Sequence, residues 1–148
     1  MTDFYRDHYK SYGWRTFAVD PAGFLTPFLD LLPPGASLLD VGCGAGRDLL
    51  WFKKRGFQVT GFEKSPGLAD LARKNAGCDV IEGDFETFDF SAFSFDGILA
   101  SAAFVHIPHD RLPDVIANIC PALVKNGLIY TSLKKGEGAE ADDAFWPG

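Results

Sequence analysis

The chain has 148 residues, of which 47% are hydrophobic and 23% charged, a size and balance that fit one globular domain with its own core. Its formal net charge of −6 argues against a nucleic-acid-binding surface, which needs clustered Lys and Arg. The sequence shows no leader and no apolar run near the roughly 20 residues of a membrane helix, so we expect neither secretion nor membrane association. Three widely spaced cysteines predict a cytoplasmic protein without a disulfide framework or a metal site.

We expect the first 36 residues to form a helical lid. Aromatic side chains recur there at helical spacing, at Tyr5, Tyr9, Tyr12 and Trp14. This stripe either packs on the domain or forms the upper wall of a substrate pocket. A following helix is expected to use Thr26 as its N-cap and Pro27 as its first residue, because proline is tolerated at that position.

From residue 37 onward, apolar runs alternate with helical patterns. Strands are predicted at 37–40, 58–63, 79–84, 95–101 and 128–133, with a loop at 85–94 and a turn at Asn126-Gly127. Helices are predicted to end at Gly56, at Gly77 and near Pro121, the second of them capped by Ser65. The alternation predicts a doubly wound, Rossmann-like α/β core of about five parallel strands over residues 37–133, and a tail at 134–148.

The most informative stretch is 39–48, Leu-Asp-Val-Gly-Cys-Gly-Ala-Gly-Arg-Asp. Alternate glycines let the backbone adopt positive φ and approach a ligand closely. Ligands of such sheets bind beyond the carboxyl ends of the strands, where Asp40, Glu63, Asp84 and Ala100–Ser101 would gather. Glu63 has the spacing of an acid that binds ribose hydroxyls, although acids at strand ends also cap helices. We interpret the stretch as a cradle for a nucleoside-containing ligand.

The spacing of the glycines disfavours a dinucleotide site. A dinucleotide fingerprint would have its third glycine at position 47, where this chain has Arg47. A side chain at that helix start hinders the close backbone approach that a pyrophosphate requires.

At these residues the chain resembles the class I S-adenosylmethionine-dependent methyltransferases of the small, single-domain type, over roughly residues 5–140. The matching segments are 39–48, 61–65, 83–85, 95–98 and 123–128. The resemblance implies S-adenosylmethionine as cofactor and a small-molecule methyl acceptor. It places the glycine turn under the methionyl group, Glu63 at the ribose, Asp84 at the adenine amine and Phe85 against the ring. The implied cofactor-binding residues are Asp40, Gly42, Cys43, Gly44, Gly46, Arg47, Glu63, Lys64, Ser65, Asp84, Phe85, Ala100 and Ser101.

Two roles remain open for side chains in this region. Arg47 either pairs with the methionyl carboxylate or pairs with Asp48 or Glu63. Alignment supplies much of the rate of methyl transfer, so a dedicated base is optional. His106 is the candidate base for a hydroxyl or thiol acceptor; its alternative role is that of a loop histidine that caps or packs.

The end of the chain departs from the family pattern. The family continues past the fifth strand with a helix and an antiparallel strand pair, whereas only about fifteen residues follow here. Residues 128–133 would then be an apolar edge, which sheets avoid exposing. We expect a fragment of a longer protein, a homodimer through this edge, or a tail that covers it with Phe145 and Trp146. The alternative function is a module that binds the cofactor without a complete acceptor site.

Overall fold

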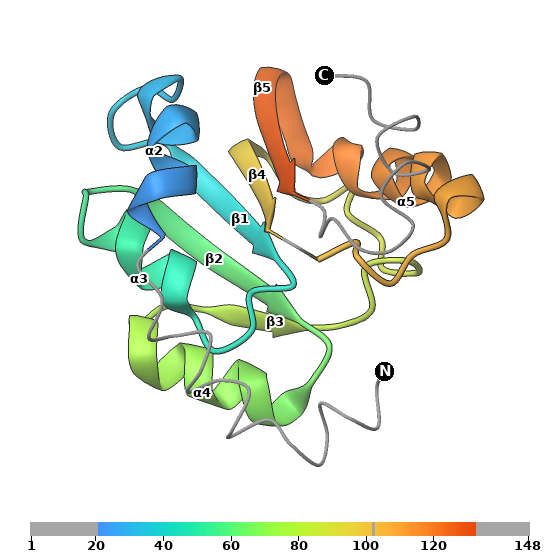
Figure 1. Ribbon diagram of the computed structural model, residues 1–148, viewed down its shortest axis with the longest axis horizontal. Helices are drawn as coiled ribbons and strands as arrows, with labels where there is room; N and C mark the ends of the chain where they lie inside the picture. Colours follow the sequence, from blue (N-terminus) through green and yellow to red (C-terminus); the bar gives the residue numbers. More distant parts are fainter. Residues whose placement is uncertain (1–20, 102, 133–148) are drawn as a thin grey trace.

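The computed structural model describes residues 21–101 and 103–132, and Figure 1 shows their path. The helices are α2 (Ala22–Asp30), α3 (Arg47–Lys53), α4 (Pro66–Ala76) and α5 (Leu112–Ile119), with short 3-10 turns η1 (His109–Arg111) and η2 (Cys120–Ala122). The strands are β1 (Ser37–Val41), β2 (Gln58–Glu63), β3 (Val80–Glu82), β4 (Phe95–Ser101) and β5 (Leu123–Ser132). The predicted aromatic stripe and the tail lie outside the described residues.

The five strands form one sheet in the order β3-β2-β1-β4-β5, and every neighbouring pair is parallel. Asp40 of β1 is in register with Gly61 of β2 on one side and with Leu99 of β4 on the other. The chain runs out to β3 and then returns to β4 beside β1, so the strand order reverses between β1 and β4. The predicted doubly wound, Rossmann-like α/β fold is confirmed.

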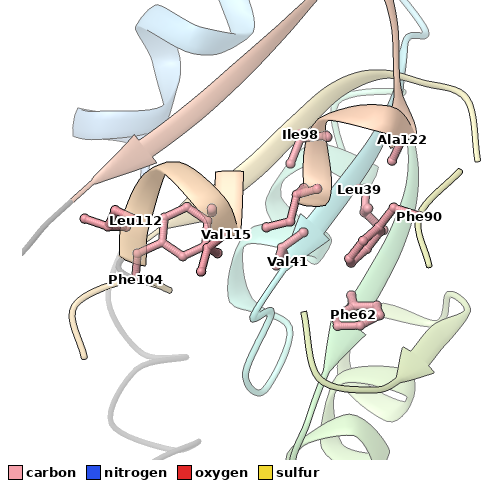
Figure 2. Close-up of a cluster of buried hydrophobic side chains, with 11 residues drawn as sticks. Leu39, Val41, Phe62, Phe90, Ile98, Phe104, Leu112, Val115 and Ala122 are labelled. Atoms are coloured by element: carbon pink, nitrogen blue, oxygen red, sulfur yellow. The ribbon is translucent and has the colours of Figure 1, made fainter. Parts of the chain in front are cut away.

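Successive residues of the central strands face opposite sides of the sheet, and each side has its own core. On one side, Leu38 and Leu99 pack with residues of α2 and α3. The other side packs against α5 and the loop at 85–94. Figure 2 shows this cluster, with Leu39, Val41, Phe62, Phe90, Ile98, Phe104, Leu112, Val115 and Ala122 labelled. Helices therefore cover both faces, and the edge at the carboxyl ends of the strands remains for ligand binding.

The start of α2 differs from the prediction. The helix begins at Ala22, with Pro21 at the N-cap position and Pro27 inside the helix, and the Thr26 hydroxyl donates to the Ala22 carbonyl at 2.6 Å instead of capping. A proline in the helix interior costs a hydrogen bond. The longer helix carries Leu25 and Phe28 into the core, where both are buried, and this burial offsets the cost.

The last strand also differs from the prediction. β5 begins at Leu123, five residues before the predicted start, and includes the predicted turn at Asn126-Gly127. Asn126 adopts φ 67°, and the pairing with β4 shifts register between Phe95 and Gly97, so the two residues form an irregularity within the strand. Among the described residues β5 pairs with β4 alone, and a dimer through its outer edge stays a prediction.

Several local signals are confirmed. The Ser65 hydroxyl accepts from the Leu68 N–H and caps α4, which has Pro66 at its first position and ends at Gly77 in the left-handed region. α5 ends before Pro121, as predicted. α3 ends at Lys53, three residues before Gly56, which itself adopts φ 91°. Within 21–101 and 103–132, no helix is long and apolar enough to cross a membrane.

Gly46 allows α3 to start directly against α4. It adopts φ 94°, and a Cβ added there would lie 3.0 Å from the Ala72 Cα. We expect Gly46→Ala to lower the free energy of unfolding by about 1–3 kcal/mol, because it combines left-handed strain with a backbone clash. Gly23→Ala is the control, since an added Cβ meets nothing within 4 Å in α2 and is expected to stabilise the helix. Urea unfolding measures both, and a Gly46→Ala variant as stable as the parent would contradict this packing role.

Candidate functional site

Glycine residues allow the backbone of the turn after β1 to adopt positive φ angles. Gly42 and Gly44 adopt φ 74° and 57°, which confirms the predicted positive φ values. The N–H groups of Gly42 and Cys43 both donate to the Phe62 carbonyl, at 2.7 and 3.1 Å, and fasten the turn to β2. A Cβ at Gly42 would lie 2.9 Å from the Cβ of Ala103. Only glycine fits this position without displacing its neighbour.

Glu63, the last residue of β2, connects two turns. Its Oε1 accepts from the Gly44 N–H at 2.8 Å, and its Oε2 accepts from the Ser65 N–H at 2.9 Å. Burial raises the pKa of Glu63, and the backbone donors oppose that shift. The carboxylate therefore fixes the glycine turn relative to the start of α4. It performs this structural task while also lining a pocket.

Two further buried acids lie behind the glycine turn. Asp40 is 3% exposed, and its Oδ2 has no hydrogen-bond partner among the described residues. Burial, followed by the nearby Asp48 carboxylate, raises the pKa of Asp40 well above its ordinary value, and Arg47 partly opposes this. Arg47 pairs with Asp48 at 2.7 Å and lies over the Phe24 ring, 5.1 Å from its centroid. Of the two roles left open for Arg47, the structure shows the pairing with Asp48.

A pocket of about 340 Å³ lies at the carboxyl ends of the strands. Its walls bring together nine residues that the sequence pointed to, namely Gly42, Gly44, Glu63, Lys64, Ser65, Asp84, Phe85, Ser101 and His106. Five others do not line it: Asp40, Cys43, Gly46, Arg47 and Ala100. Cys43 and Ala100 belong to the hydrophobic core, and Gly46 packs against α4, so these residues support the pocket from behind.

The remaining walls come from residues that were not among the predicted cofactor-binding residues. Phe62, Leu68 and Ile107 supply apolar surface, and Gly83, Glu86, Ala103 and Arg111 complete the lining. Gly83 belongs to the matching segment 83–85 and Glu86 directly follows it, so this motif is the one signal that points to them. Ala103, Ile107 and Arg111 follow β4 without a recognisable spacing.

Two ion pairs connect the turns at the rim of the pocket. Lys64 Nζ lies 3.1 Å from Asp84 Oδ2, and Arg111 of η1 pairs with Glu86. The Asp84 Oδ1 also accepts from the Glu86 N–H at 2.9 Å, so the turn after β3 is internally braced. These contacts join the ends of β2 and β3 and the segment after β4 into one rim.

Phe85 is packed in the pocket wall, whereas His106 is exposed to solvent. The Phe85 ring packs edge-on against Phe104, with centroids 5.3 Å apart, and this contact fixes its position in the wall. His106 is exposed and lies in the turn that the Ile107 N–H closes on the Phe104 carbonyl, at 3.0 Å. The described residues hold no group of His, Cys, Asp or Glu that could bind a metal ion.

The arrangement combines glycine backbone, an acid at the second strand end and an aromatic residue after the third. Together they give an α/β protein a pocket at the carboxyl edge of its sheet, the place where ligands of such sheets bind. A family model described as a methyltransferase domain matches residues 38–127. The chain belongs to this methyltransferase family, which confirms the family resemblance seen in the sequence.

Curated relatives share about a third of their aligned residues with the chain. A 24-methylenesterol C-methyltransferase from Oryza sativa subsp. japonica is 34% identical over 126 residues, covering 76% of this chain and 34% of the relative. A malonyl-[acyl-carrier protein] O-methyltransferase from Serratia marcescens is 32% identical over 114 residues, covering 76% of this chain and 44% of the relative. The chain thus spans less than half the length of these relatives.

Solved structures share the fold. A TehB-like S-adenosylmethionine-dependent methyltransferase from Corynebacterium glutamicum superimposes with a TM-score of 0.73 at 29% identity, covering 83% of this chain and 72% of that one. An amino pentose methyltransferase from Micromonospora echinaspora, bound to S-adenosylmethionine, gives a TM-score of 0.71 at 26% identity, covering 84% and 56%. The five-stranded core is therefore the shared methyltransferase core.

The buried acids predict a characteristic pH dependence of stability. The folded-state pKa of Asp40 lies above its ordinary value of 3.8, so the folded chain keeps a proton that the unfolded chain releases. This contribution to stability is complete below the ordinary pKa and is lost as pH rises through the folded pKa. We expect Asp40→Asn to become more stable relative to the parent as pH rises from 4 to 8.

Urea unfolding at several pH values measures this difference, with Asp30→Asn on the exposed end of α2 as the control. The Asp30→Asn variant loses an exposed carboxylate and so separates the effect of burial from that of removing one charge. An Asp40→Asn variant whose disadvantage grows with pH would contradict the inferred environment of Asp40.

Proposed function

We propose that this chain is the cofactor-binding domain of an S-adenosylmethionine-dependent methyltransferase that acts on a small molecule. The carrying observation is that one pocket of about 340 Å³ gathers the glycine turn, Glu63 and the Asp84-Phe85 pair in a chain of the methyltransferase family. These groups come from the ends of three adjacent strands, β1, β2 and β3. Their convergence supports a ligand that is nucleoside at one end and zwitterionic at the other.

The residues present fit the cofactor. Gly42 and Gly44 leave bare backbone along the pocket floor, where a Cβ on Gly42 would meet Ala103. In the proposal this floor lies under the methionyl group, Glu63 accepts from the ribose hydroxyls, Asp84 accepts from the adenine amine and Phe85 packs on the ring. When bound, S-adenosylmethionine supplies a methyl group on an already activated sulfonium leaving group.

The other predicted residues contribute in two ways. Three of them line the pocket, and we propose that their polar atoms contact the ligand: Lys64, Ser65 and Ser101. The residues behind the wall shape it, and these are Asp40, Cys43, Gly46, Arg47 and Ala100. Because Arg47 is paired with Asp48, we assign it to holding the start of α3 and not to the methionyl carboxylate.

The names of the relatives support a small-molecule acceptor. They include a sterol C-methyltransferase, a malonyl-[acyl-carrier protein] O-methyltransferase and a hydroquinone methyltransferase. His106, exposed in the pocket wall, is our candidate base for a hydroxyl or thiol acceptor. A cytoplasmic location fits the three free cysteines, and a homodimer through β5 remains part of the proposal.

A binding-only module is the second candidate. It is considered because the described lining contains the residues assigned to the cofactor, and His106 is the one residue in it to which we assign a role toward an acceptor. Transfer of a labelled methyl group across a panel of hydroxyl, thiol, amine and carbon acceptors separates the two candidates. Turnover supports the enzyme, whereas cofactor binding with silence across the panel supports the module.

A His106 variant, tested on the same acceptor panel, shows whether His106 acts as the base. If it acts as the base, His106→Asn should reduce kcat toward hydroxyl or thiol acceptors by about 10²-fold or more. Cofactor affinity should be unchanged, because the proposed cofactor contacts lie elsewhere. An equal kcat for parent and variant on an acceptor that must lose a proton would assign His106 to packing alone.

Glu63 provides the sharpest test of the cofactor site. We expect Glu63→Ala to weaken S-adenosylmethionine binding by about 1.5–3 kcal/mol, the range for hydrogen bonds to a charged group. Glu82→Ala is the matched control, because Glu82 also ends a strand but is exposed and lies outside the pocket lining. Calorimetry measures the affinities.

Removal of the Glu63 carboxylate also frees the N–H groups of Gly44 and Ser65, so fold loss must be separated from ligand loss. Glu63→Gln keeps an acceptor oxygen for one of them, and thermal unfolding of each variant reports the fold. A folded Glu63→Ala variant with parental affinity would remove Glu63 from the site.

A further inference from the structure

The turn after β3 carries the two residues that we assign to the adenine, Asp84 and Phe85. The main-chain carbonyl of Asp84 accepts from the N–H groups of Thr87 and Phe88, at 3.1 and 2.9 Å. Residues 84–88 therefore form one hydrogen-bonded turn. Because the turn is closed on itself, the positions of its first two residues depend on how the whole turn is attached to the rest of the chain.

Asn118 of α5 attaches this turn to the fold. Its Nδ2 donates to the main-chain carbonyl of Phe85 at 2.9 Å and to that of Phe88 at 3.0 Å, across 33 and 30 residues of chain. Both partners are carbonyl oxygens, which only accept hydrogen bonds, so the amide nitrogen and not the amide oxygen must face them. One side-chain amide thus satisfies two carbonyl groups of the turn.

The helix that carries Asn118 is fixed to the core. Val115 and Ile119 of the same helix are 4% and 0% exposed, and they belong to the buried cluster in which Figure 2 shows Val115. Asn118 itself is partly buried, which limits the competition of water for its hydrogen bonds. The amide therefore connects a well-packed helix to the turn that carries Asp84 and Phe85.

Loss of the Asn118 amide would act on ligand binding through the conformation of the turn. Two carbonyl groups without their donor favour rearrangements that expose them to water. If only a fraction of the molecules then hold Asp84 and Phe85 in the arrangement that binds adenine, the apparent affinity falls by that fraction. Asn118 does not line the pocket, so this effect reaches the ligand through the turn.

We propose that Asn118 is a positioning residue for recognition of the nucleobase: its amide holds the turn so that Asp84 accepts from the adenine amine and Phe85 packs on the ring. The inference rests on the proposed function of the site. It gives α5 a part in selecting the base of the ligand, although no residue of this helix lines the pocket.

Calorimetric titration with two ligands tests the proposal. The first is S-adenosylhomocysteine, and the second is its purine analogue, in which a hydrogen atom replaces the adenine amine. We expect the parent chain to bind the first ligand more tightly. Asn118→Asp keeps the shape of the side chain but places an oxygen against the two carbonyl groups, so it should weaken S-adenosylhomocysteine by about tenfold. The analogue has no amine contact to lose and should weaken less, so the ratio of the two affinities should fall.

Asn75→Asp is the matched control. The Asn75 side chain of α4 also donates from its amide to a main-chain carbonyl, that of Ala45 in the glycine turn, at 2.9 Å. Ala45 does not line the pocket, and the glycine turn is assigned to the methionyl group. The control therefore loses a comparable hydrogen bond away from the adenine, and its ratio of affinities should equal that of the parent.

Asn118→Ala keeps the proposal testable if Asn118→Asp does not fold, because it removes the amide without adding a charge. Thermal unfolding of each variant reports the fold separately from the ligand. A folded Asn118 variant with the parent ratio would overturn the proposal, whether both affinities stay unchanged or fall equally.

The parent chain separates this inference from the proposed function. If the parent binds both ligands equally, recognition of the amine is overturned, while cofactor binding stands. If the parent binds neither ligand at millimolar concentration, the proposed function is overturned and the inference falls with it.

Discussion

The site depends on the two hydrogen bonds that the Glu63 carboxylate accepts, one from Gly44 after β1 and one from Ser65 before α4. They connect turns that are 19 and 2 residues away along the chain and hold both at the carboxyl edge of the sheet. Gly44 can be reached because it adopts φ 57°, and Ser65 is thereby positioned to cap α4. Glu63, which we expect to bind the ribose, thus also holds the two turns in place. Its removal is therefore expected to lower both the stability of the fold and the affinity for the ligand.

The features predicted correctly from the sequence are those that depend on residues close together in the chain. The glycine turn, the Ser65 cap and the acids at the strand ends each depend on residues close together in the chain, and the structure has all of them. The parallel sheet follows from the alternation of apolar runs and helical patterns. Nine predicted residues meet in one pocket because parallel strands end at a common edge. Their roles toward the cofactor stay predictions.

The structure differs from the sequence-based prediction where contacts with distant parts of the chain outweigh local conformational preference. Thr26 and Pro27 form a good helix start, yet α2 begins earlier because that brings Leu25 and Phe28 into the core. Asn126-Gly127 is a typical turn sequence. The residues before and after it both pair with β4, however, so β5 continues through these two residues as an irregular strand. The pairing of Glu86 with Arg111 joins residues 25 positions apart, and no local pattern encodes it.

The central claim is that one ligand occupies the pocket formed by the ends of β1, β2 and β3. Amide chemical shifts of the ¹⁵N-labelled chain, followed during titration with S-adenosylhomocysteine, test it most directly. The account predicts that the largest changes fall on Gly42, Gly44, Ser65, Asp84 and Phe85, with small changes along α2 and the outer part of β5. Changes centred elsewhere, or a spectrum that does not respond to millimolar ligand, would contradict it.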